Sequence, residues 1–341
     1  MLYGTQGGPT VHAGAAGVPV TLLGPFLQGP FGARLSPRYA TLFQIIHGHP
    51  HSRPALLAAL RHLKPRALHL QWAGLFRLGG WAAREVGVPC TWELPNLVSP
   101  ALWRLNARIY HAVCAHYGIL AMANSAFTAA TMGPGPCPVT VVPLGADEQR
   151  FERARRPLSR ASLGFPAGAF VVGVVARLHP EKGQAVLLEA IRASAPSRVT
   201  ALIAGDGQEM ARLRALAPEG TVFVGEVQDV ERYFPLMDLL VNWRLTPEPF
   251  GLSLIEAAFA GVPALSHAAG GPLEIIRDGS TGLLENDLSA LGLAAGLRRA
   301  LALKAGGRLK AMGARARKDA LKRFTVKAWA ARYLAQIPGP R

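Results

Sequence analysis

The stretch from residue 170 to residue 190 decides the fold. It reads Phe170-Val-Val-Gly-Val-Val-Ala176, then Arg177-Leu-His-Pro-Glu-Lys-Gly183, then Gln184-Ala-Val-Leu-Leu-Glu-Ala190. The first part is a short run rich in β-branched residues, which is typical of a strand buried in a parallel sheet. The last part has apolar residues at helical spacing, and the helix is predicted to run over 184–193. A buried strand, a polar loop and a helix form the unit of an α/β fold.

The same alternation continues on the C-terminal side of this stretch. We predict strands over 198–204, 221–224, 238–242 and 262–266, and helices over 210–217, 252–260 and from residue 272. Residues 288–336 are predicted to be helical and strongly basic. Strands separated by helices of about ten residues predict a doubly wound parallel sheet.

The N-terminal half follows the pattern less regularly. We predict strands over 18–23, 67–70, 88–92, 118–122 and 139–142, with helices over 56–63 and 75–86. The segment 148–169 is polar and basic and carries Pro157 and Pro166, so it is predicted to link two sheets. The predicted domains are residues 1–147 and 170–322, joined by this linker and followed by a C-terminal helix over 323–341.

The charge of the chain predicts an affinity for anions. Its 37 Lys and Arg residues against 21 Asp and Glu residues give a net charge of +16 at pH 7. Such a balance favours a phosphorylated substrate or an anionic membrane surface, although an Arg-rich, Ala-rich composition explains it equally well. No basic-aromatic motif or helix-turn-helix pattern is found, so we expect no nucleic-acid partner.

Location and metal binding are predicted from what the sequence contains. No apolar run reaches the ~18 residues that a membrane-spanning helix needs, and no signal-peptide pattern precedes the first strand. Cys90, Cys114 and Cys137 have no metal-binding spacing, which favours buried, reduced thiols and predicts no metal site. We expect a cytoplasmic protein, either free or peripheral at the inner face of the membrane.

The densest group of candidate site residues is Thr246-Pro-Glu-Pro-Phe-Gly-Leu-Ser-Leu-Ile-Glu256. It follows a predicted strand, so it lies at the carboxyl edge of the sheet, where open α/β sheets bind ligands. Glu248 and Glu256 can accept from vicinal hydroxyls, and Gly251 lets the backbone approach a ligand. A structural alternative is that Ser253 and Glu256 form a capping box and that Phe250 belongs to the core.

Two further groups lie on predicted loops at the same edge. Arg177 and Lys182 are five residues apart after the strand ending at Ala176 and can hold a diphosphate, although a solvated basic loop is the alternative. Gly270 and Gly271 precede the helix predicted from residue 272, where free amides can bind an anion or form an ordinary turn.

Several short motifs occur in a fixed order and together resemble one family. They are Arg177-x4-Lys182-Gly183, Gly205-Asp-Gly207, Val224-Gly225, Glu248-Pro-Phe-Gly251, Glu256-Ala-Ala, Ala260-Gly-Val-Pro263, Gly270-Gly271, Glu274-Ile-Ile and Asp278-Gly-Ser-Thr-Gly282. This order resembles the retaining GT-B glycosyltransferases of group 1 (family 4), which carry a Glu-x7-Glu motif. The resemblance extends from about Ala126 to the C-terminus and implies two Rossmann-like domains that face each other across a cleft.

The resemblance implies a role for each matching residue. Arg177 and Lys182 resemble the pair that neutralises the donor diphosphate, and Glu248 resembles the residue that meets the donor sugar. The backbone of Phe250, Gly251 and Leu252 resembles the amide loop beside sugar and phosphate. Glu256 resembles the residue that holds the ribose. The resemblance further implies that the C-terminal helix returns to the N-terminal domain.

Three positions differ from the family pattern. Gly7-Gly8 stands too close to the strand predicted over 18–23 for the usual intervening helix, so the N-terminal domain is predicted to be abbreviated. Glu93 stands where the family often has a His near the donor sugar. Asn242-Trp-Arg244 replaces the usual Pro-Ser before the Glu-x7-Glu loop.

The expected function is therefore a hexosyltransferase-like, metal-independent transfer with retention of configuration. The donor is expected to be a UDP-, GDP- or ADP-sugar, and the acceptor a glycan or a lipid-linked molecule. The alternatives are an inactive relative that binds a nucleotide or glycan and, more remotely, a basic nucleic-acid-binding protein.

Overall fold

The computed structural model describes residues 2–3, 21–22, 53–98, 101–152, 158–194 and 199–337. The chain divides into two compact units. The first comprises Met1–Asn124, Thr128–Val141 and Leu334–Arg341, and the second comprises Ser125–Phe127 and Val142–Tyr333.

The second unit is built on a six-stranded parallel sheet with the order β12-β11-β10-β7-β8-β9. Its strands are β7 (Phe170–Val175), β8 (Val199–Ala204), β9 (Val222–Gly225), β10 (Leu239–Asn242), β11 (Ala264–His267) and β12 (Gly282–Glu285). The chain first builds outward from β7 to β9 and then returns to place β10 on the other side of β7. This reversal is the topological switch point of a Rossmann-type sheet.

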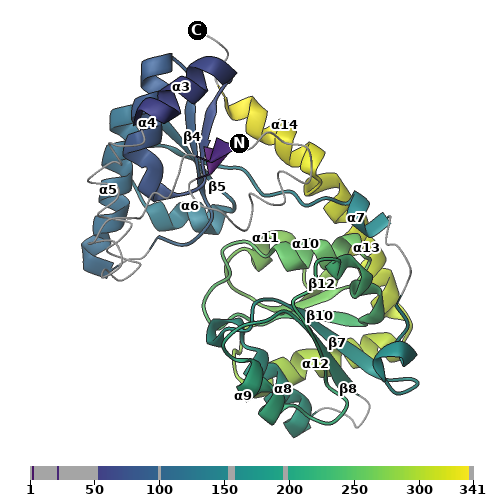
Figure 1. The fold of residues 1–341 in the computed structure, drawn as a ribbon. Coiled ribbons are helices and arrows are strands. Elements are labelled where there is room, and N and C mark those ends of the chain that lie inside the picture. The colour runs from purple at the N-terminus through teal and green to yellow at the C-terminus, as the bar shows by residue number, and fades with distance from the viewer. Residues whose placement is uncertain are drawn as a thin grey trace. The chain divides into compact units, whose positions relative to one another are not determined.

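Helices cover both faces of this sheet (Figure 1). One face carries α8 (Gln184–Ser194), α9 (Met210–Leu216) and α12 (Ala290–Ala305), and the other carries α10 (Leu252–Phe259), α11 (Pro272–Ile275) and α13 (Arg308–Arg323). The unit also contains the short α7 (Gln149–Glu152) and the residues of α14 (Val326–Gln336) up to Tyr333. Short 3-10 turns fall at Ala161–Leu163, Pro180–Lys182, Val230–Arg232 and Phe234–Leu236.

Alternation along β7 explains why the sheet is covered twice. Val172 and Val174 are buried in the core that includes α8 and α12, whereas Val171 is buried in the core that includes α10 and α13. A strand with apolar residues on both faces must be covered on both faces. This burial fixes β7 in the middle of the sheet and so fixes where its carboxyl end lies.

The first unit contains a four-stranded parallel sheet with the order β3-β4-β5-β6. Its strands are β3 (Leu68–Leu70), β4 (Cys90–Leu94), β5 (Ile119–Ala123) and β6 (Val139–Val141), and its helices are α3 (Arg53–Leu63), α4 (Phe76–Val86), α5 (Ala101–Tyr117) and α6 (Ala126–Met132). The rings of Phe76, Trp92 and Tyr110 meet edge to face in its core. Two short strands, β1 (Leu2–Tyr3) and β2 (Thr21–Leu22), pair in parallel.

The predicted α/β class with parallel sheets is confirmed. The sequence did not predict α5, α6 or β12. Of the strand predicted over 18–23 only Thr21–Leu22 is described, and Gly7-Gly8 lies outside the described residues. In the predicted linker, Phe151 and Phe165 pack into the core of the second unit.

Candidate functional site

The candidate site lies where β7 and β10 end side by side. The loop after β7 carries Arg177 and Lys182, and the loop after β10 carries Arg244 and Glu248. Because the sheet order reverses between these two strands, their loops diverge to opposite faces and leave room for a ligand. Residues separated by some seventy positions in the chain therefore meet at one edge of the sheet.

The loop after β7 is held against its neighbours through the backbone. The Gln184 side chain donates to the Arg177 carbonyl oxygen at 3.0 Å. Gly183 has a φ of 67°, and a Cβ at this position would collide with the carbonyl oxygen of Trp243. Gly205 makes a similarly close approach to the carbonyl of Ala176. Glycine is required at both positions, because only glycine permits such contacts at positive φ.

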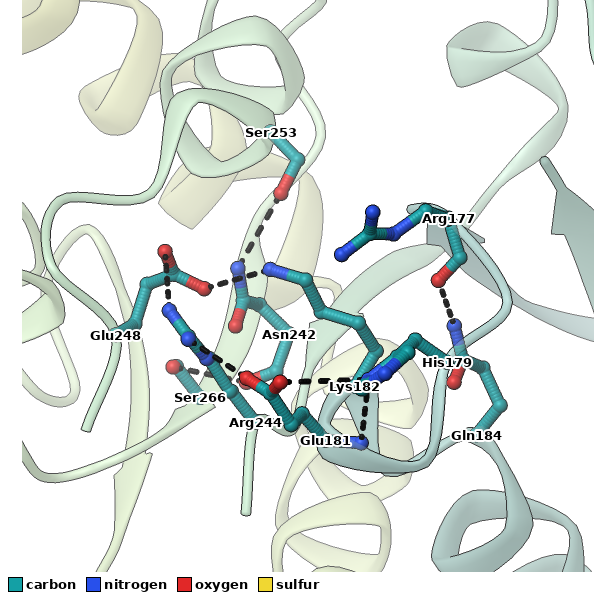
Figure 2. Close-up of polar contacts among 10 residues, drawn as sticks. All are labelled: Arg177, His179, Glu181, Lys182, Gln184, Asn242, Arg244, Glu248, Ser253 and Ser266. Carbon is teal, nitrogen blue, oxygen red and sulfur yellow. Dashed lines mark hydrogen bonds and ion pairs between the residues drawn. The ribbon is translucent and has the colours of Figure 1, made fainter. Parts of the chain in front are cut away.

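An ion-pair network joins the two loops (Figure 2). Lys182 Nζ donates to Glu248 Oε2 at 3.2 Å, and Arg244 Nη1 lies 3.5 Å from Glu248 Oε1. Arg244 Nη2 also donates to Glu181 Oε2 at 2.8 Å, and this hydrogen bond lowers the pKa of Glu181. We call Glu181, Lys182, Arg244 and Glu248 the ion-pair network.

Arg177 lies beside the network without joining it. Its side chain is exposed and points toward the middle of the group drawn in Figure 2. Among the described residues no acceptor is found for its guanidinium, whereas its carbonyl oxygen is bonded to Gln184. This guanidinium is therefore free to bind an anion.

The predicted pair Gly270 and Gly271 packs against the Glu248 loop. Gly271 N donates to the Glu248 carbonyl at 2.8 Å, and a Cβ on either glycine would collide with the backbone between Glu248 and Phe250. The helix that follows, α11, has only four residues, so it offers little dipole for an anion. The structure thus gives the two glycines a packing reason and brings them together with Glu248.

The start of α10 contradicts the capping-box alternative. Gly251, with a φ of 112°, is the N-cap residue, and no side chain caps the helix. The Ser253 hydroxyl instead accepts from Asn242 at 3.3 Å. Leu252 is 44% exposed, whereas Phe250 is 3% exposed and packs on Phe324, so the Phe250 side chain belongs to the core.

Glu256 lies one turn further along α10. Burial raises the pKa of its carboxyl group to about 7, Arg150 lowers it, and Glu231 raises it again. Arg150 donates to Glu231 at 2.6 Å. Glu256 therefore has its own charged neighbours, and no contact joins it to the ion-pair network within the described part of the chain.

Glu93 belongs to β4 of the first unit. Its carboxylate lies 3.7 Å from His69 Nε2, and His69 Nδ1 is 2.9 Å from the Thr91 hydroxyl. These side chains form a polar group near the carboxyl end of the first sheet. The role predicted for Glu93 stays a prediction.

Arg244 and Glu181 are the site residues that sequence reasoning missed. Both stand in the quoted motifs, but the direction of a side chain on a loop cannot be derived from spacing alone. The signal that was available is the replacement of Pro-Ser by Trp243-Arg244, which adds a cation four residues before Glu248.

Two searches restricted to the described residues gave negative results. In this part of the chain, no three His, Cys, Asp or Glu side chains are placed to hold a metal ion. None of the described helices is both long and apolar enough to span a bilayer.

Fold and site together define a class: a Rossmann-type domain that presents cations and carboxylates at its switch point, as nucleotide-sugar-binding domains do. Comparison with known proteins identifies the family. Residues 155–319 match the family model of glycosyl transferases group 1, and this part of the chain belongs to that family. The resemblance inferred from the motifs is confirmed.

Two curated relatives support the assignment. A GDP-mannose-dependent alpha-mannosyltransferase of Mycobacterium tuberculosis is 33% identical over 240 residues, which cover 67% of this chain and 62% of that protein. A D-inositol 3-phosphate glycosyltransferase of Actinosynnema mirum is 34% identical over 201 residues, covering 50% and 48%. The chain thus matches about half to three fifths of the length of these relatives.

A solved structure shares the fold. The crystal structure of Anabaena Alr3699/HepE in complex with UDP-glucose superposes with a TM-score of 0.78 at 22% identity, covering 98% of this chain and 90% of that one. This similarity confirms the GT-B fold class.

Proposed function

We propose that the protein is a glycosyltransferase that moves a sugar from a nucleoside-diphosphate sugar to a hydroxyl of a carbohydrate or lipid-linked acceptor. One observation carries the proposal: Arg177, Lys182 and Glu248 meet at the switch point of a group 1 domain. Cations suit a diphosphate, and a carboxylate suits the hydroxyls of the sugar.

The proposed chemistry places charge where these residues lie. The bond from the anomeric carbon to the diphosphate breaks, a bond to the acceptor oxygen forms, and the leaving group gains negative charge. Arg177 and Lys182 stabilise that charge, and removing such a donor commonly raises the barrier by about 3 kcal/mol or more. We infer retention of configuration from the Glu-x7-Glu resemblance, and NMR of the anomeric proton of the product tests it.

No metal ion takes part in the proposed transfer, because the two cationic side chains replace it. Treatment with EDTA is expected to leave turnover unchanged, and a loss restored by Mg²⁺ or Mn²⁺ would contradict this. The relatives named above make GDP-mannose and the UDP-sugars the first donors to test.

A screen of UDP, GDP and ADP by thermal unfolding tests the proposal. A ligand present at 100 times its Kd stabilises the native state by about 2.7 kcal/mol, so a clear rise in melting temperature is expected for one of them. Glu248→Ala is expected to abolish transfer while the protein stays folded. If no nucleoside diphosphate stabilises the protein, the proposal is wrong.

An inactive relative is the second candidate, favoured by Glu93 at the position where the family often has a His. It predicts nucleotide binding without turnover of any donor sugar.

We also propose a cytoplasmic location with peripheral contact to anionic lipid. The exposed positions of α13 carry Arg308, Lys310, Arg315, Lys318 and Lys322. A row of basic side chains binds anionic membrane surfaces. The three cysteines are free and buried, which fits a reducing compartment. Co-sedimentation with vesicles with and without phosphatidylserine tests the contact.

A further inference from the structure

Arg244 occupies a position between two carboxylates. Its two terminal nitrogens reach Glu181 at 2.8 Å and Glu248 at 3.5 Å, and its side chain is 17% exposed. Its Nε is buried and has no acceptor among the described residues. The guanidinium is therefore held by the two carboxylates alone.

The backbone on both sides of Arg244 is anchored. Trp243 is buried, and its indole Nε1 donates to the Leu288 carbonyl at 3.0 Å. Leu245 N donates to the Glu181 carbonyl at 2.8 Å. Gly183 also packs against the Trp243 carbonyl. Arg244 therefore cannot follow a ligand without breaking the junction between the two loops, and an arginine keeps its charge at every accessible pH.

Lys182 is in the opposite situation. Its side chain is 29% exposed, and its ammonium pairs with Glu248, whose side chain is 13% exposed. The function proposed above requires Lys182 to bind the donor diphosphate. If it were the sole counter-ion of Glu248, its departure would leave a mostly buried carboxylate unpaired, which is strongly unfavourable.

We propose that Arg244 is a positioning residue that remains the counter-ion of Glu248 when a diphosphate draws Lys182 away. This inference rests on the proposed function. The fixed cation holds the carboxylate in place from one side, and the flexible cation is released to the ligand. Occupancy of the ligand site and orientation of Glu248 are thereby separated between two side chains.

A double-mutant cycle tests the inference by isothermal titration with UDP and GDP. Arg244→Met is expected to weaken the binding of the nucleoside diphosphate by about tenfold or more, because Lys182 must then leave Glu248 unpaired. Glu248→Gln is expected to bind at least as tightly as the unaltered protein, since its amide does not retain Lys182. The double variant is expected to bind like Glu248→Gln.

Controls separate this role from general electrostatics and from folding. Arg308→Met removes the same charge from an exposed position of α13 and is expected to leave the affinity within about twofold. Arg244→Lys is expected to restore part of the affinity, since it returns a point charge without the fork. Arg244→Gln provides a second cycle if the Met variant does not fold.

Two outcomes would overturn the inference. If Arg244→Met binds as tightly as the unaltered protein, Arg244 is not the counter-ion. If the loss persists in the double variant, Arg244 acts on the ligand directly or only on the structure. Failure of the proposed function gives a different result, because the unaltered protein would then bind neither nucleotide.

Discussion

The carboxyl ends of the two sheets differ in charge. At the second sheet three cations, Arg177, Lys182 and Arg244, stand against the carboxylates of Glu181 and Glu248. The first sheet presents one carboxylate, Glu93, together with His69 and Thr91. An edge with excess positive charge suits a diphosphate, whereas a carboxylate with neutral polar groups suits hydroxyls. The difference teaches that the two units are suited to different halves of a transfer reaction.

Lys182→Met should break this comparison most strongly. It removes the flexible cation of the second sheet, and kcat/KM with the best donor is expected to fall more than about a hundredfold. Lys310→Met, at an exposed position of α13, provides the matched control and should retain activity. An unchanged rate in the Lys182 variant would show that the excess positive charge does not serve the leaving group.

Glu256→Gln tests whether burial at the second sheet costs stability. The pKa of Glu256 is raised from 4.5 to about 7, so between these values the folded protein binds more protons than the unfolded chain. Stability therefore falls as the pH rises through this window, and at 1.36 kcal/mol for each pH unit the loss by pH 8 is about 3 kcal/mol.

The Gln variant lacks this ionisation. By urea unfolding it should be more stable than the unaltered protein at pH 8 and equally stable at pH 4. Its affinity for UDP or GDP should fall at the same time if the carboxylate holds the ribose. Equal stability of the two proteins at pH 8 would exclude the raised pKa.

Glu93→Gln should sharpen the comparison with the smallest effect. A hydrogen bond to a charged group is worth about 1.5 kcal/mol or more, so turnover is expected to fall about tenfold. The Kd of UDP or GDP should not change, because the diphosphate-binding cations belong to the other unit. Glu85→Gln, exposed at the end of α4, is the control. A weaker nucleotide affinity in the Glu93 variant would contradict the division between the sheets.

The sequence predicted most of the second unit, because its strands are continuous apolar runs closed by glycine-rich loops. β7 and β10 were placed within a residue of their observed ends, and this sufficed to bring Arg177, Lys182 and Glu248 to one edge. α5 was missed because polar, aromatic and cysteine residues obscure its helical period. β12 has four residues and offers too short a pattern.

The capping box failed for a geometric reason. Gly251 is the N-cap, so Ser253 is the second residue of the helix and not its cap. A shift of two residues in a predicted helix start is ordinary, but it changes which side chain meets the free amides. The contact of Arg244 with Glu181 could not be predicted either, because it depends on how two loops fold against each other.

The reversal between β7 and β10 also has a consequence for the growing chain. The loop after β7 is synthesised long before the loop after β10, because β8, α9 and β9 intervene. A nascent chain that ends at β9 already carries Arg177 and Lys182 but has no Glu248 to pair with them. Pairing across such a sequence separation is slow to form. Diphosphate recognition and sugar recognition thus arise at different moments of biosynthesis, and only the arrival of β10 unites them.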